Sequence, residues 1–149
     1  MAGKAKKFAG LVLILYGIVM AYLLFLQRQP ANLDYWTYVK SSYNLRPLHT
    51  IRQMTGLLHH ERLFWFAAAN LAGNIVMFLP LGLLPVVWQR QSRFWVYLLT
   101  VGGLILAVEL LQLFTTLGAA DIDDWIFNVL GAILGFGLWK LLAGREKTE

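Results

Sequence analysis

Cysteine is absent from the chain, and its absence excludes two ways of stabilising a small protein. None of the 149 residues is Cys. The fold therefore contains no disulfide and no metal site built on thiolates. The absence does not identify the compartment in which the protein works.

Charged residues are also scarce. They make up 14% of the chain, whereas an ordinary soluble domain has about 25%. Apolar residues make up 58%, which is more than the core of one soluble domain of this length can bury. Some of this apolar surface must face something other than water, and a lipid bilayer is the simplest candidate.

Four segments have the length and composition of membrane-spanning helices, which need about 20 mostly apolar residues. We therefore predict an all-α membrane protein, a bundle of about four transmembrane helices forming a single domain over residues 1–149. The predicted spans are 8–26, 63–88, 94–114 and 125–142. The first run is too long for the core of a signal peptide, and we expect it to be retained. Pro80 predicts a kink in the second span.

The basic residues indicate how the spans are oriented. The net charge is +5, but Lys and Arg form short clusters at the ends of apolar runs and no basic face, so nucleic-acid binding is not expected. With four spans, three clusters share one side, which the positive-inside rule makes the cytoplasm. Both termini are then cytoplasmic. The clusters contain Lys4, Lys6, Lys7, Arg90, Arg93, Lys140, Arg145 and Lys147.

Residues 27–62 form the long segment outside the predicted spans, on the outer side of the membrane. Four of its residues are spaced three or four apart, with polar and basic residues between them, which predicts a short amphipathic helix on the membrane surface. These four are Leu48, Ile51, Thr55 and Leu58. Whether residues 45–60 lie on the membrane or dip into it is open. The ligand-contact candidates in this segment are Asn44, Arg46 and Arg52.

The fourth predicted span opens with three aspartates and carries an asparagine. Residues three and four apart share a helix face. If the helix begins near Asp121, one face carries Asp121, Asp124, Asn128, Gly131 and Gly135. The two glycines allow close approach of another helix, within the bundle or across a dimer. Asp123 points elsewhere, and we expect it to cap the helix end.

Polar residues also interrupt the second and third spans. Glu109 and Gln112 share a face about two turns from the outer end of the third span. A charge deep in a span costs roughly 2.5–3.5 kcal/mol, so we expect Glu109 to be protonated or paired and to face protein or a hydrated cavity. Asn70 and Asn74 lie four apart in the second span, and Gly73 beside them is a predicted packing position.

These polar residues lie at one depth. At about 1.5 Å per residue, they fall roughly 5–15 Å from the outer boundary. Three helices that place polar groups at the same level are expected to face each other there. The group then forms either a hydrogen-bonded contact that holds the helices together or a pocket open to the outer leaflet, and the acidic residues favour the pocket. The residues at this depth are Asn70, Asn74, Glu109, Gln112 and Asn128, and with Asp121 and Asp124 from the start of the fourth span they make the seven residues of the predicted pocket.

Four motifs carry a resemblance to a known family. They are YNLRPLHTI (43–51), NLAGNIVMFLPLG (70–82), Glu109 with Gln112, and DIDDWIFNVLGAILG (121–135). In order and spacing they resemble the VanZ-like family of small bacterial membrane proteins, named after a component of teicoplanin-type glycopeptide resistance. The resemblance covers most of the chain beyond residue 27. It implies a multi-spanning protein of the bacterial cytoplasmic membrane, linked in some members to resistance, but no biochemical mechanism.

The chain departs from the family pattern in two places. Family members often have Asn-Leu-Ile-Pro-Phe where this chain has NLRPL (44–48). They also often have an arginine shortly before the aspartate cluster, where this chain has LGAA (117–120). An arginine that pairs with Asp121 or Glu109 would have to come from elsewhere, and Arg46 and Arg52 are the candidates.

Three functions are compatible with these residues. The first is a non-catalytic envelope protein whose pocket binds a lipid-linked or amphiphilic polar ligand: a membrane lipid, a cell-wall precursor or a glycopeptide antibiotic. The second is an intramembrane enzyme that uses Glu109 and Asp121 or Asp124 on a lipid head group. The third is a small transporter, which the apolar inner half disfavours. No cofactor or metal site is predicted, and homo-oligomerisation is open.

Overall fold

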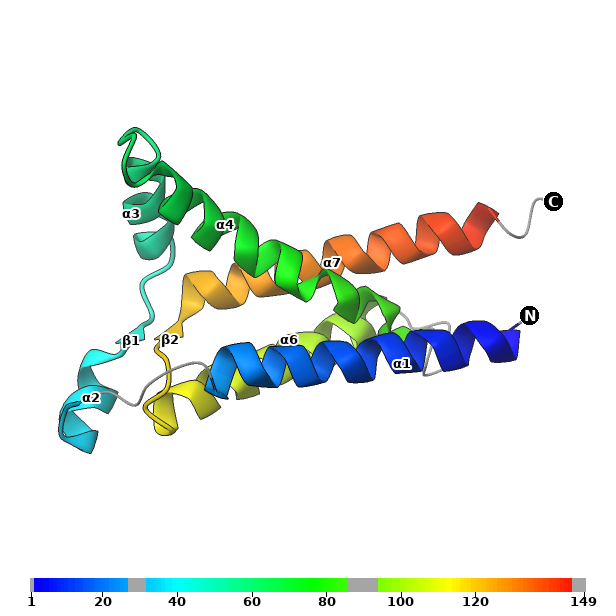
Figure 1. Cartoon of the computed structure of the whole chain (residues 1–149), viewed down its shortest axis with the longest axis horizontal. Helices are drawn as coiled ribbons and strands as arrows, with labels where there is room; N and C mark the ends of the chain where they lie inside the picture. Colours follow the sequence, from blue (N-terminus) through cyan, green and yellow to red (C-terminus); the bar gives the residue numbers. More distant parts are fainter. Residues whose placement is uncertain (1, 27–31, 86–93, 146–149) are drawn as a thin grey trace.

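The computed structural model describes residues 2–26, 32–85 and 94–145, and the chain in these ranges is almost entirely helical (Figure 1). The predicted all-α architecture is confirmed. Residues 27–31 of the outer segment, residues 86–88 of the second predicted span, and the basic residues at 90, 93 and 147 lie outside the described ranges.

Four helices within these ranges are long and apolar enough to cross a membrane. Helix α1 (Ala2–Ala21) continues into the π-helical turn η1 (Tyr22–Leu26), and α4 (Phe64–Phe78) continues into the 3₁₀ helix η2 (Leu79–Leu83). Helices α6 (Phe94–Phe114) and α7 (Ile122–Arg145) complete the set. Helix α7 begins three residues earlier than the predicted span, so Asp123 and Asp124 lie in its first turn.

Pro80 accounts for the change from α4 to η2. Proline has no N–H to donate, and its ring clashes with the carbonyl one turn earlier, so an α-helix cannot continue through it unchanged. The chain tightens into the 3₁₀ conformation at Leu79, with Pro80 in the first turn. This is the distortion that the sequence predicts for the second span.

Glycines allow α7 and the α4–η2 segment to pack backbone against backbone. A Cβ on Gly131 would overlap the carbonyl oxygen of Ile75, and one on Gly135 would overlap that of Leu79. Gly82 on η2 in turn abuts the backbone of Gly135. Small residues let membrane helices approach to backbone contact. Of the two alternatives left open by the sequence, this structure therefore shows the contact within the chain.

Gly73, a predicted packing position, makes no close contact with the described residues. A Cβ there would meet no atom within 4 Å. Gly73 lies two residues before Ile75, which places it about 200° around the helix from the face that meets α7.

The apolar core lies where α6, α7 and η2 meet. The side chains of Tyr97, Val101 and Ile105 on α6 are each 1% exposed. The Tyr97 hydroxyl donates to the carbonyl oxygen of Ala132 at 2.7 Å, and its ring stacks on Phe136. By contrast, α1 has many exposed large apolar side chains, including Phe8, Leu11, Ile14, Leu15 and Ile18. In a bilayer this surface faces lipid.

The outer segment packs onto the start of α7. It contains α2 (Tyr35–Ser41), the short strand β1 (Tyr43–Asn44) and α3 (His49–Leu57). Strand β1 pairs in parallel with β2 (Ala120–Asp121), just before α7. Helix α3 is the expected short amphipathic helix, and it packs against α4 and α7. Helix α2 and the strand pair were not expected.

Both termini lie at one end of the bundle, and α2, α3, β1 and β2 lie at the other (Figure 1). The end with α2 and α3 is called the outer end below.

Candidate functional site

A polar cavity of about 210 Å³ lies between α4, α6 and α7, near the outer end. It contains six of the seven residues predicted for the pocket: Asn70, Asn74, Glu109, Gln112, Asp124 and Asn128. The remaining lining residues are Leu24, Met77, Phe78, Val108 and Ala119. Polar residues from three helices therefore meet at one place, at the level where the sequence puts them. Their role in binding a ligand stays a prediction.

Asn74 and Asp124 join α4 to α7 at the cavity. The Asn74 amide nitrogen Nδ2 donates to Asp124 Oδ1 at 2.7 Å. This pairing depends on the backbone contact of Gly131 with Ile75, which brings the two helices close two turns further along α7. The amide and the carboxylate thus form part of the wall of the cavity.

Glu109 and Asn128 join α6 to α7 on another wall. Both side chains are buried, at 7% and 5% exposure. Asn128 Nδ2 donates to Glu109 Oε1 at 3.3 Å, which gives Glu109 the protein partner expected for an acidic residue inside a span. The other polar atom of the amide, Asn128 Oδ1, is buried and accepts no hydrogen bond within the described structure.

Gln112 connects the cavity to η1 and to the end of α6. Its side-chain Nε2 donates to the carbonyl oxygen of Leu24 at 3.3 Å. The backbone carbonyl oxygen of Gln112 accepts from the backbone N–H groups of Leu117 and Gly118. These two hydrogen bonds terminate α6. Gln112 therefore holds η1 against α6 beside the cavity.

The cavity lining has a clear chemical character. Its two ionisable side chains, Glu109 and Asp124, are both acidic, and none of the described residues that line it is Lys, Arg or His. The remaining polar groups are amides. Asn128 Oδ1 adds a buried acceptor that has no hydrogen-bond partner among the described residues. A buried carbonyl oxygen without a hydrogen bond costs about 1–3 kcal/mol.

Asp121 does not belong to this group, and its predicted place in the pocket is corrected. Helix α7 begins at Ile122, so Asp121 precedes the helix and lies off the face that carries Asp124. Its Oδ1 accepts from the backbone N–H of Asp123 at 2.8 Å, which is the geometry of an N-cap for α7. Thr50 Oγ1 and Asn44 Nδ2 also donate to its carboxylate.

The three outer-segment candidates have different surroundings. Asn44 lies in the Asp121 cluster, and its Oδ1 accepts from the backbone N–H of Arg46 at 3.1 Å. Arg46 and Arg52 are exposed and do not line the polar cavity. The Asn44 amide and the Thr50 hydroxyl therefore lie beside Asp121, at the place for which Arg46 and Arg52 were the candidates.

Asp123 has a role that sequence reasoning assigned to the wrong helix. It is fully buried, and its carboxylate accepts from the backbone N–H groups of Leu48, Thr50 and Ile51 at 2.6, 2.8 and 3.2 Å. Leu48, the residue at the N-cap position of α3, supplies no side-chain cap of its own. Asp123 thus caps α3 from a distant part of the chain. The absence of Ser, Thr, Asp or Asn before α3 was the available signal.

Comparison with known proteins places the chain in a family. A family model described as VanZ/LLP1 matches residues 12–143. Protein VanZ from Enterococcus faecium is 28% identical over 130 residues, which cover 87% of this chain and 72% of that protein. No solved structure matches the chain. Since the family model spans most of the sequence, including all four motifs noted above, the chain belongs to the VanZ/LLP1 family.

Proposed function

We propose that this membrane protein binds the polar head of a membrane amphiphile in the cavity between α4, α6 and α7, without catalysing a reaction. The main support is Asn128, which lines a cavity of amides and acids and whose buried Oδ1 accepts no hydrogen bond from the described residues. Buried polar groups are nearly always hydrogen-bonded. A head group with hydroxyl or amine donors supplies the missing hydrogen bond.

The lining favours a neutral or cationic head over a phosphate. Glu109 and Asp124 both accept hydrogen bonds, and a phosphate would bring a further acidic group against them. A sugar offers several hydroxyl donors, and an amine offers N–H donors. Arg46 and Arg52, which would suit phosphate, lie outside the cavity lining. A glycosylated lipid, a sugar-bearing cell-wall precursor and a glycopeptide antibiotic all fit this chemistry.

The proposal includes a location and an orientation. We propose the bacterial cytoplasmic membrane with both termini in the cytoplasm. The start of α1, which contains Lys4, Lys6 and Lys7, and the end of α7, which contains Lys140, lie at the same end of the bundle. The cavity then lies near the outer surface. Occupancy there by a sugar-bearing wall precursor or by the antibiotic itself would account for the link of the family with teicoplanin-type resistance.

The test measures head-group binding in lipid nanodiscs with monoglucosyl diacylglycerol as the probe and phosphatidylglycerol as the anionic comparison. The six tryptophans report thermal unfolding. We expect the glucolipid, and not phosphatidylglycerol, to raise the unfolding temperature. Asn128→Leu removes one hydrogen bond worth about 1 kcal/mol and should weaken binding about fivefold.

Two further variants make the test decisive. Asn70→Leu changes the lining from α4 without removing the partner of Glu109, and it should also weaken binding. Thr100→Val is the control, since Thr100 is an exposed residue of α6 whose hydroxyl bonds only its own helix at Val96. Wild-type affinity in folded Asn128→Leu and Asn70→Leu would refute the proposal.

An intramembrane enzyme is the second candidate, because Glu109 and Asp124 line the same cavity. The version that uses Glu109 with Asp121 loses its geometric basis, since Asp121 lies in a separate cluster. Incubation with the glucolipid followed by mass spectrometry distinguishes the two functions. Conversion that depends on Glu109 supports the enzyme, and unchanged lipid supports a binding protein.

A further inference from the structure

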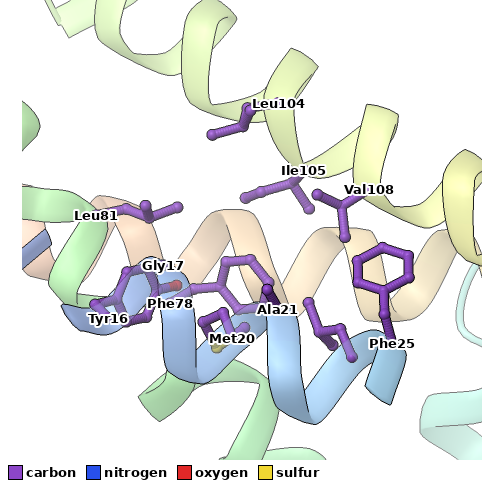
Figure 2. Close-up of a pocket in the computed structure, with 11 residues that line it drawn as sticks. Tyr16, Gly17, Met20, Ala21, Phe25, Phe78, Leu81, Leu104, Ile105 and Val108 are labelled. Atoms are coloured by element: carbon purple, nitrogen blue, oxygen red, sulfur yellow. The ribbon is translucent and has the colours of Figure 1, made fainter. Parts of the chain in front are cut away.

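A second cavity, of about 230 Å³, lies beside the polar one, between α1, η2 and α6 (Figure 2). Its walls are apolar apart from the Tyr16 hydroxyl. In Figure 2 the side chains of Ile105 and Val108 extend from α6 toward α1 and η1, which carry Met20 and Phe25 on the facing side. The full lining is Tyr16, Gly17, Met20, Ala21, Leu24, Phe25, Phe78, Leu81, Leu104, Ile105 and Val108. We call this cavity the apolar groove.

The apolar groove and the polar cavity are adjacent. Leu24, Phe78 and Val108 line both of them. Along α6 the lining passes from Leu104 and Val108 in the groove directly to Glu109 in the polar cavity. The groove therefore lies on the side of the polar cavity that faces the middle of the bundle, where the chain of a lipid lies relative to its head group.

The groove has a closed floor and an open rim. Ile105 and Met20 are buried, at 1% and 8% exposure, whereas Leu104 is 50% exposed. Gly17 and Ala21 on the α1 side are also exposed. A Cβ on Gly17 would meet no atom within 4 Å, so α1 leaves open space here. A hydrocarbon chain can enter sideways from the bilayer between α1 and α6.

We propose that the apolar groove holds one acyl chain of the lipid whose head occupies the polar cavity. This inference rests on the proposed function. Each cavity alone is smaller than a typical ligand site of about 300–1,000 Å³, and the two together reach that range. An acyl chain gains little from leaving the equally apolar bilayer. Binding of the head in the polar cavity therefore drives the attached acyl chain into the groove. The protein then selects lipids by head group and acyl chain together.

The experiment maps where the chain of a bound lipid lies. The probe is monoglucosyl diacylglycerol with a photoreactive diazirine on one acyl chain, reconstituted with the full-length protein in nanodiscs. After irradiation, mass spectrometry identifies the labelled residues. We expect labelling at Met20, Ala21, Leu104 and Ile105 in excess of the lipid-facing residues Leu11 and Leu15, and competition by unlabelled glucolipid.

A pair of α1 variants provides the matched control. Gly17→Leu fills the groove, and it needs no backbone movement because the space is open. Gly10→Leu makes the same change two turns earlier, also in open space, on a residue outside the groove lining. We expect Gly17→Leu to abolish groove labelling and Gly10→Leu to preserve it.

The outcomes separate this inference from the proposed function. If the glucolipid stabilises the protein but labelling is spread evenly over lipid-facing residues, or persists in Gly17→Leu, the acyl-chain site is refuted and head binding stands. If the glucolipid neither stabilises the protein nor labels the groove, both proposals fail.

Discussion

A single carboxylate, that of Asp123, fixes the position of the outer helix α3. It accepts from three backbone N–H groups at the start of that helix, including that of Leu48. Leu48 has φ of 65°, a left-handed conformation that costs a residue other than glycine about 1–3 kcal/mol. The carboxylate both satisfies the free N–H groups and offsets this strain.

Asp123→Ala is expected to lower the free energy of unfolding by roughly 3 kcal/mol, because it leaves buried N–H groups without a charged acceptor. The measurement is thermal unfolding followed by tryptophan fluorescence. Asp34→Ala is the matched control: Asp34 caps its own helix α2 at an exposed site, and its loss should cost about 1 kcal/mol. Equal effects of the two substitutions would contradict the role assigned to Asp123.

At the residue scale, sequence reasoning finds polar residues and misses apolar ones. Asn74, Glu109 and Asn128 stand out because polar groups in a span are costly, and their shared depth implies a shared location. Val108 and Phe78 also line the cavity, but an apolar residue in a span faces lipid, core or cavity without any difference in its chemistry. Asp121 was predicted to share the helix face of Asp124 because the helix was expected to begin near Asp121. Helix α7 begins at Ile122, so Asp121 precedes it.

At the scale of elements, the contact between α7 and the α4–η2 segment organises the molecule. Gly131 and Gly135 bring backbone against backbone, and the Asn74–Asp124 hydrogen bond forms beside this contact. Sequence spacing identified both glycines but not their partner, since the same spacing serves an internal contact or a dimer. Gly82 was missed, because its role appears only once Pro80 has changed the helix type.

Gly131→Ala and Gly135→Ala are expected to destabilise the protein strongly, by about 2 kcal/mol or more, because an added methyl group overlaps backbone atoms that cannot move independently. Gly73→Ala and Gly137→Ala are the controls, since a Cβ at either meets no atom within 4 Å. Unfolding temperatures in one detergent give the comparison. Similar values for all four variants would show that α7 does not make this contact.

At the scale of the whole molecule, an even number of spans puts both termini at one end (Figure 1). Composition predicts the membrane and the number of spans, because hydropathy is a property of whole segments. The way α2, α3 and the strand pair pack was not predictable, since it depends on contacts between residues far apart in the sequence, such as the hydrogen bond from the Tyr38 hydroxyl to the carbonyl oxygen of Gly118.

The orientation proposed above is tested by cysteine labelling, which the native sequence makes simple because it contains no cysteine. We expect a membrane-impermeant maleimide to label His59→Cys in intact cells, since residue 59 follows α3 at the outer end. Lys4→Cys, before the first span, should react only after lysis. The reverse pattern would place the polar cavity on the cytoplasmic side.

The most direct measurement of the central claim is an experimental structure of the protein in nanodiscs containing monoglucosyl diacylglycerol. We expect the sugar to lie between α4, α6 and α7, with a hydroxyl within about 3.2 Å of Asn128 Oδ1. A structure in which Asn128 Oδ1 bonds another helix, with the sugar elsewhere, would contradict it.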